Sequence, residues 1–437
     1  MFSVGLYTLG CKVSQYETEA VGEAFIKHGF VLSDFSSPCD VYVINTCTVT
    51  QESDRKSRQV IRRAKKNNPD ALIMVMGCYS QRSPSEVSEI DGVSVVIGTE
   101  NKLSLPEIAL EMLADAEKKN QKTVKTTDVK KAEFERMKIT SAPRTRAYVK
   151  IEDGCESKCT YCAISDARGR VRSKAPEDVI SEVLGLYKSG TCEIVLTGIE
   201  TGSYGRDFDE KYDLADLICE LDRKKCAERI RLGSLAPELI TKDFVERVRS
   251  AKILAPHFHL SIQSGSDSVL YKMKRRYNSK MAMDVIENIR LNIPGATFTT
   301  DIMVGFPGES EENFLETVDF VKRAKFLDAH VFAYSKRAGT PAASYDGQIP
   351  EDIKSQRSKR LIRIKNEVRD LILSEIVDKG KGLSVVCESL SEDGFYTAHS
   401  DTYVEVKFKS SNSDLTGKIL NVKPVSQKNG IIYGELI

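Results

Sequence analysis

AYVKIEDGCESKCTYC, residues 147–162, joins a strand-like run to three closely spaced cysteines. Cys155, Cys159 and Cys162 follow the strand candidate 147–152 with the spacing CxxxCxxC. Five more strand candidates come later, separated by amphipathic stretches: 194–197, 230–235, 257–262, 297–304 and 329–334. Six such units predict an incomplete (β/α)6 barrel, a fold that places its chemistry on the loops after its strands. The three cysteines therefore stand where such a barrel is expected to have its active site.

The spacing of these three cysteines indicates an iron–sulfur cluster more than a zinc site. Structural zinc takes four closed ligands, and no fourth cysteine or histidine stands beside the trio. A [4Fe-4S] cubane needs one ligand per iron, so three thiolates leave one iron open to a small molecule. S-adenosylmethionine (SAM) can chelate that iron through its amino and carboxylate groups and be cleaved by one electron. Buried structural thiols are the alternative, which this spacing on a barrel loop disfavours.

A second set of cysteines is spread over the first eighty residues. Short apolar runs at 4–9, 41–45, 72–76 and 93–97 alternate with helix-like stretches, which predicts a doubly wound α/β domain. Cys11, Cys47 and Cys78 each lie at or just after the end of one of these runs. Because the carboxyl ends of neighbouring parallel strands meet in one crevice, we expect the three thiols to converge there. Packing is the alternative for each of them, and the remaining cysteines, Cys39, Cys192, Cys219, Cys226 and Cys387, are expected to be structural.

The pattern along the chain predicts an α/β protein of three domains. The doubly wound domain covers 1–115, a strongly charged linker covers 116–140, and the barrel core covers 141–375. A basic helix candidate at 353–373 closes the core, and residues 376–437 form the last domain. From residue 383 onward, Val, Ile, Phe and Tyr alternate with polar residues, as in a small β-barrel.

Composition limits the partners and the compartment. Lys and Arg total 64 of 437 residues against 63 for Asp and Glu, so a nucleic acid would have to be held by local basic patches. The apolar runs are only strand-length and no basic, hydrophobic leader is visible, which predicts a cytoplasmic protein without a membrane partner. In that compartment, 11 cysteines beside 5 histidines indicate thiolate metal ligands more than disulfides.

Taken together, the motifs resemble those of the methylthiotransferases, radical SAM enzymes with an N-terminal cluster domain, a radical SAM core and a C-terminal TRAM barrel. Their wording is most similar to the subgroup that acts on N6-threonylcarbamoyladenosine at position 37 of tRNA. The matching motifs are TLGCKV (8–13), NTCTVT (45–50), KSRQ (56–59), GCY (77–79), ARGR (167–170), SIQSGSD (261–267), TDIMVGFPGE (300–309) and AGTPAA (338–343). Two positions depart from the family pattern: Ser165 stands where proline is common, and 233–237 lacks an acidic residue before its proline.

The resemblance implies replacement of the C2 hydrogen of the modified adenosine by a methylthio group. Acid–base chemistry cannot activate that carbon–hydrogen bond, so a radical cofactor is required. Cys155, Cys159 and Cys162 would hold the [4Fe-4S] cluster that cleaves SAM, and the resulting 5′-deoxyadenosyl radical would abstract the hydrogen. A second [4Fe-4S] cluster on Cys11, Cys47 and Cys78 would carry the sulfur, which a second SAM methylates. The implied partners are the tRNA anticodon stem-loop, an electron donor such as flavodoxin or ferredoxin, and a sulfur source.

Five further residues of the core are candidate contacts to SAM. Tyr161 could stack on the adenine, and Gly198 would let the backbone approach the ligand closely. Thr197, Gln263 and Asp301 are polar residues at or near the ends of predicted strands. Loop packing for Tyr161, and capping or neighbouring hydrogen bonds for the polar residues, are the alternatives.

Basic residues for RNA contact lie in two helix-like stretches, 55–66 and 354–369, and in the terminal barrel at Lys407, Lys418 and Lys423. For the second stretch the alternative is an amphipathic helix with a solvated charged face. The terminal barrel is the better candidate for gripping the RNA backbone. Two rival functions stay open: a methylthiotransferase acting on a ribosomal protein side chain or on isopentenyladenosine in tRNA, and a non-catalytic metal-dependent RNA-binding module.

Overall fold

The computed structural model describes residues 1–119 and 121–437, which form two compact units. The first unit comprises Met1–Ile139, Glu152–Lys174 and Ser335–Ala343; the second comprises Thr140–Ile151, Ala175–Tyr334 and Ser344–Ile437. Asn120, part of the predicted linker 116–140, lies outside the described residues. All six cysteines predicted to hold clusters fall in the first unit.

Within the described residues, the first unit is built on a parallel sheet in the order β2-β1-β3-β4-β5-β6. The strands are β1 (Ser3–Thr8), β2 (Val31–Ser33), β3 (Val41–Thr46), β4 (Leu72–Gly77), β5 (Val93–Ile97) and β6 (Thr123–Lys125). The predicted strands form the centre of this sheet, and the short strands β2 and β6 are its edges. Strand β6 lies inside the predicted linker, so part of that charged segment extends the sheet.

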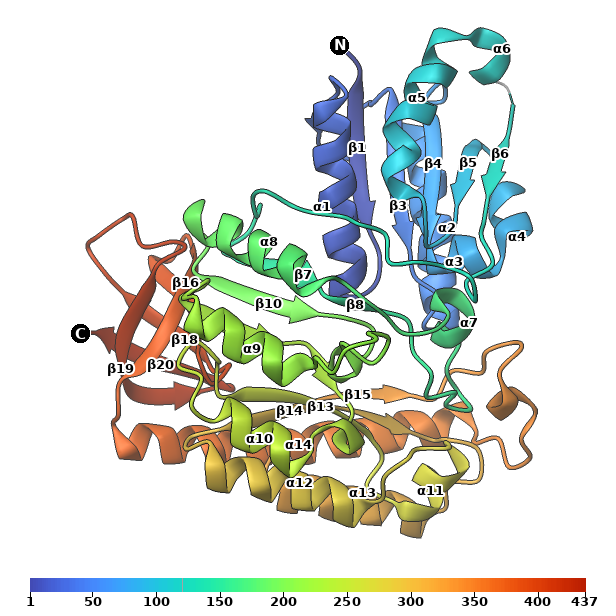
Figure 1. Ribbon diagram of the computed structural model, residues 1–437. Coiled ribbons are helices and arrows are strands. Elements are labelled where there is room, and N and C mark those ends of the chain that lie inside the picture. The colour runs from blue at the N-terminus through green and yellow to red at the C-terminus, as the bar shows by residue number, and fades with distance from the viewer. Residues whose placement is uncertain (120) are drawn as a thin grey trace. The chain divides into compact units, whose positions relative to one another are not determined.

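Alternation along the central strands explains why helices cover both faces of this sheet (Figure 1). Val41 and Val43 of β3 pack in the core that includes α1 (Lys12–Lys27) and α5 (Leu105–Ala114). Tyr42 and Ile44 point to the other core, which includes α2 (Gln51–Asn67) and α4 (Pro84–Ser88). The predicted doubly wound domain is therefore confirmed. Its shorter elements, together with those of the segment 152–174, are α3 (Cys78–Arg82), η1 (Lys102–Ser104), α6 (Ala116–Lys119), β8 (Glu152–Asp153), α7 (Ile164–Arg168) and β9 (Arg172–Ser173).

The second unit contains the predicted incomplete barrel, whose parallel strands form the rows β7-β10-β11 and β12-β13-β14-β15. They are β7 (Arg146–Lys150), β10 (Glu193–Thr197), β11 (Arg229–Leu232), β12 (Ser234–Leu235), β13 (His257–Gln263), β14 (Thr297–Val304) and β15 (Asp328–Ala333). Gly233 separates β11 from β12, and its N–H donates to the carbonyl of Leu196 at 2.7 Å. The predicted strand 230–235 is thus one path along the barrel with a break at a glycine.

Helices alternate with these strands: α8 (Pro176–Lys188), η2 (Thr201–Ser203), α9 (Leu214–Arg223), η3 (Pro237–Leu239), α10 (Lys242–Val248), α11 (Asp267–Lys272), α12 (Ser279–Asn292) and α13 (Glu311–Ala324). The turn η4 (Pro341–Ser344) and the long helix α14 (Glu351–Lys379) follow. None of the helices in the part of the chain that the structure describes has the length and apolar character needed to cross a membrane.

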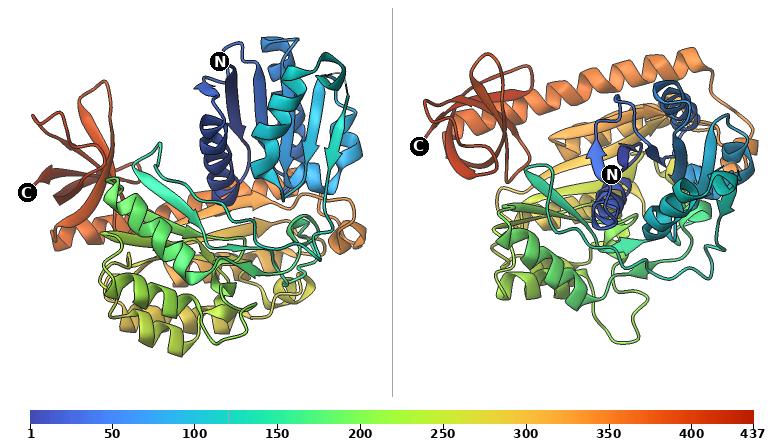
Figure 2. Two further views of the ribbon diagram at one scale, coloured as in Figure 1. Left: turned by 45° about the horizontal axis from the view of Figure 1, so that its top comes forward. Right: turned by 90° about the horizontal axis from the view of Figure 1, so that it is seen from above.

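A small closed barrel follows α14 at the C-terminus (Figure 2). Its strands are β16 (Leu383–Leu390), β17 (Phe395–Ser400), β18 (Glu405–Lys409), β19 (Ile419–Lys428) and β20 (Ile431–Leu436). Val385, Val406, Phe408, Val422 and Ile432 alternate inward and are buried in its core. Closure leaves no sheet edge exposed, which confirms the predicted β-barrel.

A buried carboxylate joins this small barrel to the large one within the second unit. Glu193 of β10 is fully buried and forms ion pairs with Arg146, Arg229 and Arg231 at 2.6, 3.2 and 3.0 Å. Arg229 also donates to Ser384 Oγ at 2.7 Å, and Arg231 donates to the carbonyl of Ser400 at 3.0 Å. Burial opposes ionisation of Glu193, but the effect of the three arginines is larger and lowers its pKa to about 2. The guanidiniums therefore fasten the small barrel to β10 and β11.

Candidate functional site

The N-terminal cysteines stand at the carboxyl ends of three adjacent strands, as predicted from the sequence. Cys11 is the N-cap of α1 after β1, Cys47 directly follows β3, and Cys78 begins α3 after β4. Strands β1, β3 and β4 are neighbours in the sheet. The crevice at this edge lies beside the point where the chain reverses its direction of winding, between β1 and β3.

Local geometry brings the three thiols within electrostatic reach of one another. Gly10 has φ of +118°, and a Cβ at this position would lie 3.2 Å from Cys47 Cβ. Burial raises the pKa of the Cys78 thiol to about 12; Arg168 opposes this shift, and the charges of Cys47 and Cys11 add to it. Burial also raises the pKa of Cys47, with Cys11 contributing. Such thiols ionise readily only when a metal or another positive group takes up the charge.

The donor set fits a cubane cluster. A cubane takes one thiolate at each of three irons while the fourth iron stays open to a small molecule. Cys11, Cys47 and Cys78 supply three free thiols at the ends of neighbouring strands. Three thiols, one of them accepting a hydrogen bond from a buried guanidinium, are suited to such a group.

The core cysteines occupy the loop between β8 and α7, in the same unit. Backbone N–H groups point at two of their sulfurs: Ser157 N lies 3.5 Å from Cys155 Sγ, and Ile164 N lies 3.4 Å from Cys162 Sγ. Gly154 has φ of +91°, and a Cβ there would come within 1.8 Å of the Arg170 carbonyl. Only glycine fits this position, because the loop doubles back on residue 170. Hydrogen bonds to sulfur stabilise thiolate ligands of an iron–sulfur cluster.

Arg168, at the end of α7, is the residue that the sequence analysis missed. Its side chain is fully buried, and its Nε–H donates to Cys78 Sγ at 3.2 Å. The two terminal nitrogens donate to Glu17 at 2.5 and 3.1 Å, and Nη1 also donates to Asp153 at 3.1 Å. Lys102, also buried, lies 3.4 Å from Glu17 and 3.1 Å from Glu135. The motif ARGR (167–170) is one of the family matches in the sequence, but no local signal paired Arg168 with Glu17, 151 positions away.

A second arginine supports the residue after Cys47. Arg337, from the segment Ser335–Ala343 of the first unit, donates to Thr48 Oγ1 at 2.5 Å and to Asp54 Oδ2 at 2.7 Å. Thr48 is fully buried, and the Arg337 side chain is only 5% exposed. This contact gives the family motif 338–343 a structural context, because it holds the neighbouring segment against the strand end that carries Cys47.

The candidate SAM contacts are divided between the two units. Tyr161 is half-buried in the first unit. In the second unit, Thr197 is the last residue of β10 and precedes Gly198, while Asp301 lies inside β14 with its Oδ2 3.2 Å from His259 Nε2. Gln263 ends β13 at a register shift and has φ of +65°. A left-handed backbone at a residue other than glycine is strained, and such strain is concentrated at functional sites.

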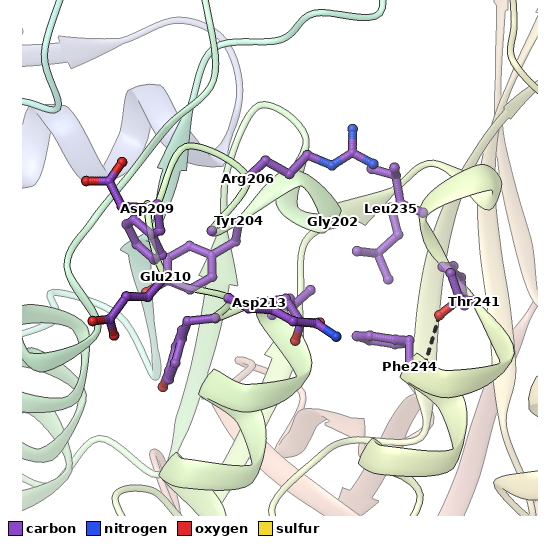
Figure 3. Close-up of a pocket in the computed structure, with 16 residues that line it drawn as sticks. Gly202, Tyr204, Arg206, Asp209, Glu210, Asp213, Leu235, Thr241 and Phe244 are labelled. Atoms are coloured by element: carbon purple, nitrogen blue, oxygen red, sulfur yellow. Dashed lines mark hydrogen bonds between the residues drawn. The ribbon is translucent and has the colours of Figure 1, made fainter.

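One pocket of the second unit, of about 410 Å³, contains none of the predicted site residues (Figure 3). It lies between the loop after η2 and the helix α10. The loop contributes Tyr204 and the charged residues Arg206, Asp209 and Glu210, and α10 contributes Phe244. No motif in the sequence predicts this pocket.

The basic helix α14 uses most of its charge inside the second unit. Six of the seven basic residues noted in 354–369 have an acidic partner within 4.0 Å: Lys354 with Glu351, Arg357 with Glu309, Arg360 with Glu311, Arg363 with Glu367, and Lys365 and Arg369 with Asp328. The structure therefore favours the alternative of an amphipathic helix with a paired charged face over phosphate contact.

Comparisons with known proteins agree with this architecture. Residues 149–321 match the model of the Radical SAM superfamily, and residues 3–98 match that of Uncharacterized protein family UPF0004. A solved radical S-adenosylmethionine methyltransferase, TsrM from Kitasatospora setae, has a TM-score of 0.59 at 16% identity and covers 78% of this chain and 75% of its own. At that identity the likeness concerns the fold.

Two curated relatives cover nearly the whole chain. The threonylcarbamoyladenosine tRNA methylthiotransferase MtaB of Bacillus subtilis is 41% identical over 100% of this chain and 96% of its own length. The tRNA-2-methylthio-N(6)-dimethylallyladenosine synthase of Thermoanaerobacter pseudethanolicus is 33% identical over 98% of this chain and 92% of its own. A radical SAM fold implies a [4Fe-4S] cluster and SAM. With relatives of this identity along its full length, the chain belongs to the methylthiotransferase family of radical SAM enzymes.

Proposed function

We propose that this chain replaces the C2 hydrogen of N6-threonylcarbamoyladenosine at position 37 of tRNA by a methylthio group. The observation that carries the proposal is the 41% identity, along the whole chain, to a relative named for that substrate. The relative named for dimethylallyladenosine is 33% identical. The alternatives of isopentenyladenosine or a ribosomal protein side chain are therefore not favoured.

Cys155, Cys159 and Cys162 hold the radical SAM cluster in this proposal, and Cys11, Cys47 and Cys78 hold a second [4Fe-4S] cluster. When bound, the two clusters and SAM supply reductive cleavage of SAM and a sulfur atom for transfer. The chain supplies thiolates, backbone N–H donors to Cys155 and Cys162, and a guanidinium at Cys78. Cys47, Cys78 and Cys159 are buried and shielded from water, whereas Cys11 is exposed and Cys155 and Cys162 are half-buried.

Tyr161, Thr197, Gly198, Gln263 and Asp301 contact SAM in this proposal. The strained backbone of Gln263 and the hydrogen bond between Asp301 and His259 support it, because both fix polar groups of the barrel in one orientation. The division into 1–115, 116–140, 141–375 and 376–437 is also kept as a proposal, with cluster binding, linkage, SAM chemistry and RNA binding as the respective roles.

The tRNA anticodon stem-loop is the partner of the small C-terminal barrel in this proposal. Lys407 of β18 and Lys423 of β19 alternate with buried residues and so project from the barrel surface, where phosphates could be bound. An electron donor such as flavodoxin or ferredoxin and a separate sulfur source complete the set of partners in the cytoplasm.

Nucleoside mass spectrometry of tRNA tests this function. Cells that lack the chain should accumulate unmodified N6-threonylcarbamoyladenosine, and the methylthio derivative should return when the gene is restored. Restoration with Cys155→Ala should leave the nucleoside unmodified and form no 5′-deoxyadenosine. An unchanged methylthio profile in the deletion strain would refute the tRNA assignment. Loss of methylthio-isopentenyladenosine instead would move the chain to the sibling subgroup.

A further inference from the structure

We propose that Arg168 is a positioning residue for the cluster on Cys11, Cys47 and Cys78. Its Nε–H fixes the Cys78 ligand and makes that cluster easier to reduce. This inference rests on the proposed function, because it takes the second cluster as given. It assigns Arg168 a role in holding that cluster, and the spacing of the cysteines does not predict this role.

The distribution of the hydrogen bonds from Arg168 is the first argument. A guanidinium has five N–H donors in a fixed fork, and it binds a carboxylate either through its two terminal nitrogens or through Nε and one terminal nitrogen, as Arg231 binds Glu193. Here both terminal nitrogens are used on Glu17, and Nη1 also reaches Asp153. The remaining Nε–H points at Cys78 Sγ, 3.2 Å away. A purely structural arginine could be satisfied by the carboxylates alone, so the sulfur contact calls for a separate explanation.

The positions of its partners are the second argument. Asp153 accepts the N–H of Gly154 at 2.9 Å, directly before Cys155. Glu17 lies on α1, the helix that begins just after Cys11. One fully buried side chain therefore contacts a segment next to each cysteine trio and a ligand of the N-terminal one. Rotation of this fork would move Cys78 and the loop of Cys155 together, so Arg168 fixes their separation within the first unit.

Charge balance gives the third argument. Arg168, Arg172 and Lys102 are set against Glu17, Asp153 and Glu135, so the buried group has three charges of each sign. Removal of the Arg168 charge would leave Glu17 and Asp153 under-compensated beside the sulfur. Reduction adds an electron to the cluster, and both hydrogen bonds to sulfur and nearby positive charge favour the reduced form. Loss of Arg168 must therefore make reduction harder.

The test uses the full chain with Cys155, Cys159 and Cys162 replaced by alanine, so that any cluster present is the N-terminal one. After anaerobic reconstitution, iron and sulfide are counted and the potential is measured by titration with electron paramagnetic resonance. If this parent variant holds no cluster, the second cluster of the proposed function fails, before any statement about Arg168 is reached. If it holds about four irons, the Arg168 variants can be compared.

Arg168→Gln should lower the potential enough to cut the reduced-to-oxidised ratio at least tenfold at fixed potential, which is about 59 mV for one electron. Arg168→Lys keeps the charge, and its potential should lie between those of the parent and of Arg168→Gln. Arg168→Gln with Glu17→Gln restores neutrality and should regain part of the shift. Arg231→Lys, which alters an equally buried guanidinium in the second unit, should leave the potential unchanged.

Equal potentials for the parent and Arg168→Gln, at equal iron content, would overturn the inference. Loss of iron from Arg168→Gln, with circular dichroism unchanged and iron retained in Arg168→Lys, would support the role in fixing the ligand. If Arg168→Gln does not fold, Arg168→Lys decides: a lowered potential supports the inference, and an unchanged one reduces Arg168 to a structural ion pair.

Discussion

Two buried ion clusters, one in each unit, use the same chemical groups in opposite arrangements. Around Arg168, one guanidinium is shared by Glu17, Asp153 and the sulfur of Cys78. Around Glu193, one carboxylate is surrounded by three arginines. Arg229 and Arg231 also reach a serine and the backbone of the small barrel, and Arg146 also pairs with Glu388 of that barrel. The first arrangement ends at a cysteine that we propose as a metal ligand, and the second ends at backbone and side-chain groups of the small barrel. A buried charge therefore does not by itself mark a functional site. The group that the outermost hydrogen-bond donor contacts is the better indicator.

Glu200 extends this comparison to a carboxylate without such a ring of arginines. It is buried at the carboxyl side of β10 and accepts the N–H of Ala236 at 2.9 Å. Burial raises its pKa to about 7, whereas the arginines lower the pKa of Glu193 to about 2. Two glutamates seven positions apart thus have opposite pKa shifts: three arginines outweigh burial at Glu193, whereas at Glu200 burial outweighs the backbone donor of Ala236 and the charge of Arg275.

The largest expected effect comes from removing the sulfur that Arg168 contacts, which is that of Cys78. Cys78→Ala should abolish methylthio product, while cleavage of SAM to 5′-deoxyadenosine continues on the other cluster. Liquid chromatography of SAM products and nucleosides measures both. Cys226→Ala, a buried cysteine of the second unit outside both trios, is the matched control and should change neither. Loss of SAM cleavage in Cys78→Ala would contradict the separation of roles.

Glu193→Gln removes the central carboxylate of the buried ion cluster in the second unit. Breaking a buried ion pair costs about 3–5 kcal/mol, because the remaining charges are left uncompensated. We expect a lowered midpoint of thermal unfolding and faster proteolysis near residue 380, with iron content unchanged. The stabilisation from Glu193 is present above its unfolded pKa of 4.5 and is lost as the pH falls through about 2. Iron loss without destabilisation would erase the contrast between the two clusters.

Glu200→Gln should act in the opposite direction. The folded state holds the Glu200 proton more tightly than the unfolded state, so its stability falls as the pH rises from 4.5 through about 7. The variant should be more stable than the parent at pH 8, by up to about 3 kcal/mol, and equally stable at pH 4. Thermal unfolding at both pH values checks this. A variant that is less stable at pH 8 would show that the carboxylate is well compensated.

The smallest effect concerns two lysines on the surface of the small barrel. Lys407→Ala should weaken binding of an anticodon stem-loop by about 1 kcal/mol and reduce the salt dependence by about one ion. Lys418→Ala is the matched control, because Lys418 is already paired with Asp414 at 2.9 Å and should matter less. Fluorescence anisotropy at several salt concentrations measures both. Equal losses would show that pairing within the protein does not decide which lysines meet phosphate.

The sequence predicted those features whose cause is local. Short strand-like runs placed β5 and β14 at their observed bounds, and strand ends placed Cys11, Cys47 and Cys78 at one edge of a sheet. Strand β6 was missed, because three residues in a charged segment carry too little pattern. Edge strands of this length are defined by their neighbour in the sheet more than by their own side chains.

Features that depend on distant partners could not be predicted. The basic residues of α14 suggest RNA contact in the sequence, but in the structure Asp328 and Glu309 lie beside them and form ion pairs. Arg168 had a motif but no role, because Glu17 and Cys78 lie 151 and 90 positions away. Charged residues are usually exposed, so nothing in the sequence identified this one as buried.

Metal content tests the central claim, that two cysteine trios in one unit each hold a cluster, most directly. Iron and sulfide should be counted on the anaerobically reconstituted chain and on variants lacking either trio. The account predicts about eight irons for the intact chain and about four for each variant. About four irons in the intact chain, falling to none when Cys155, Cys159 and Cys162 are replaced, would contradict it.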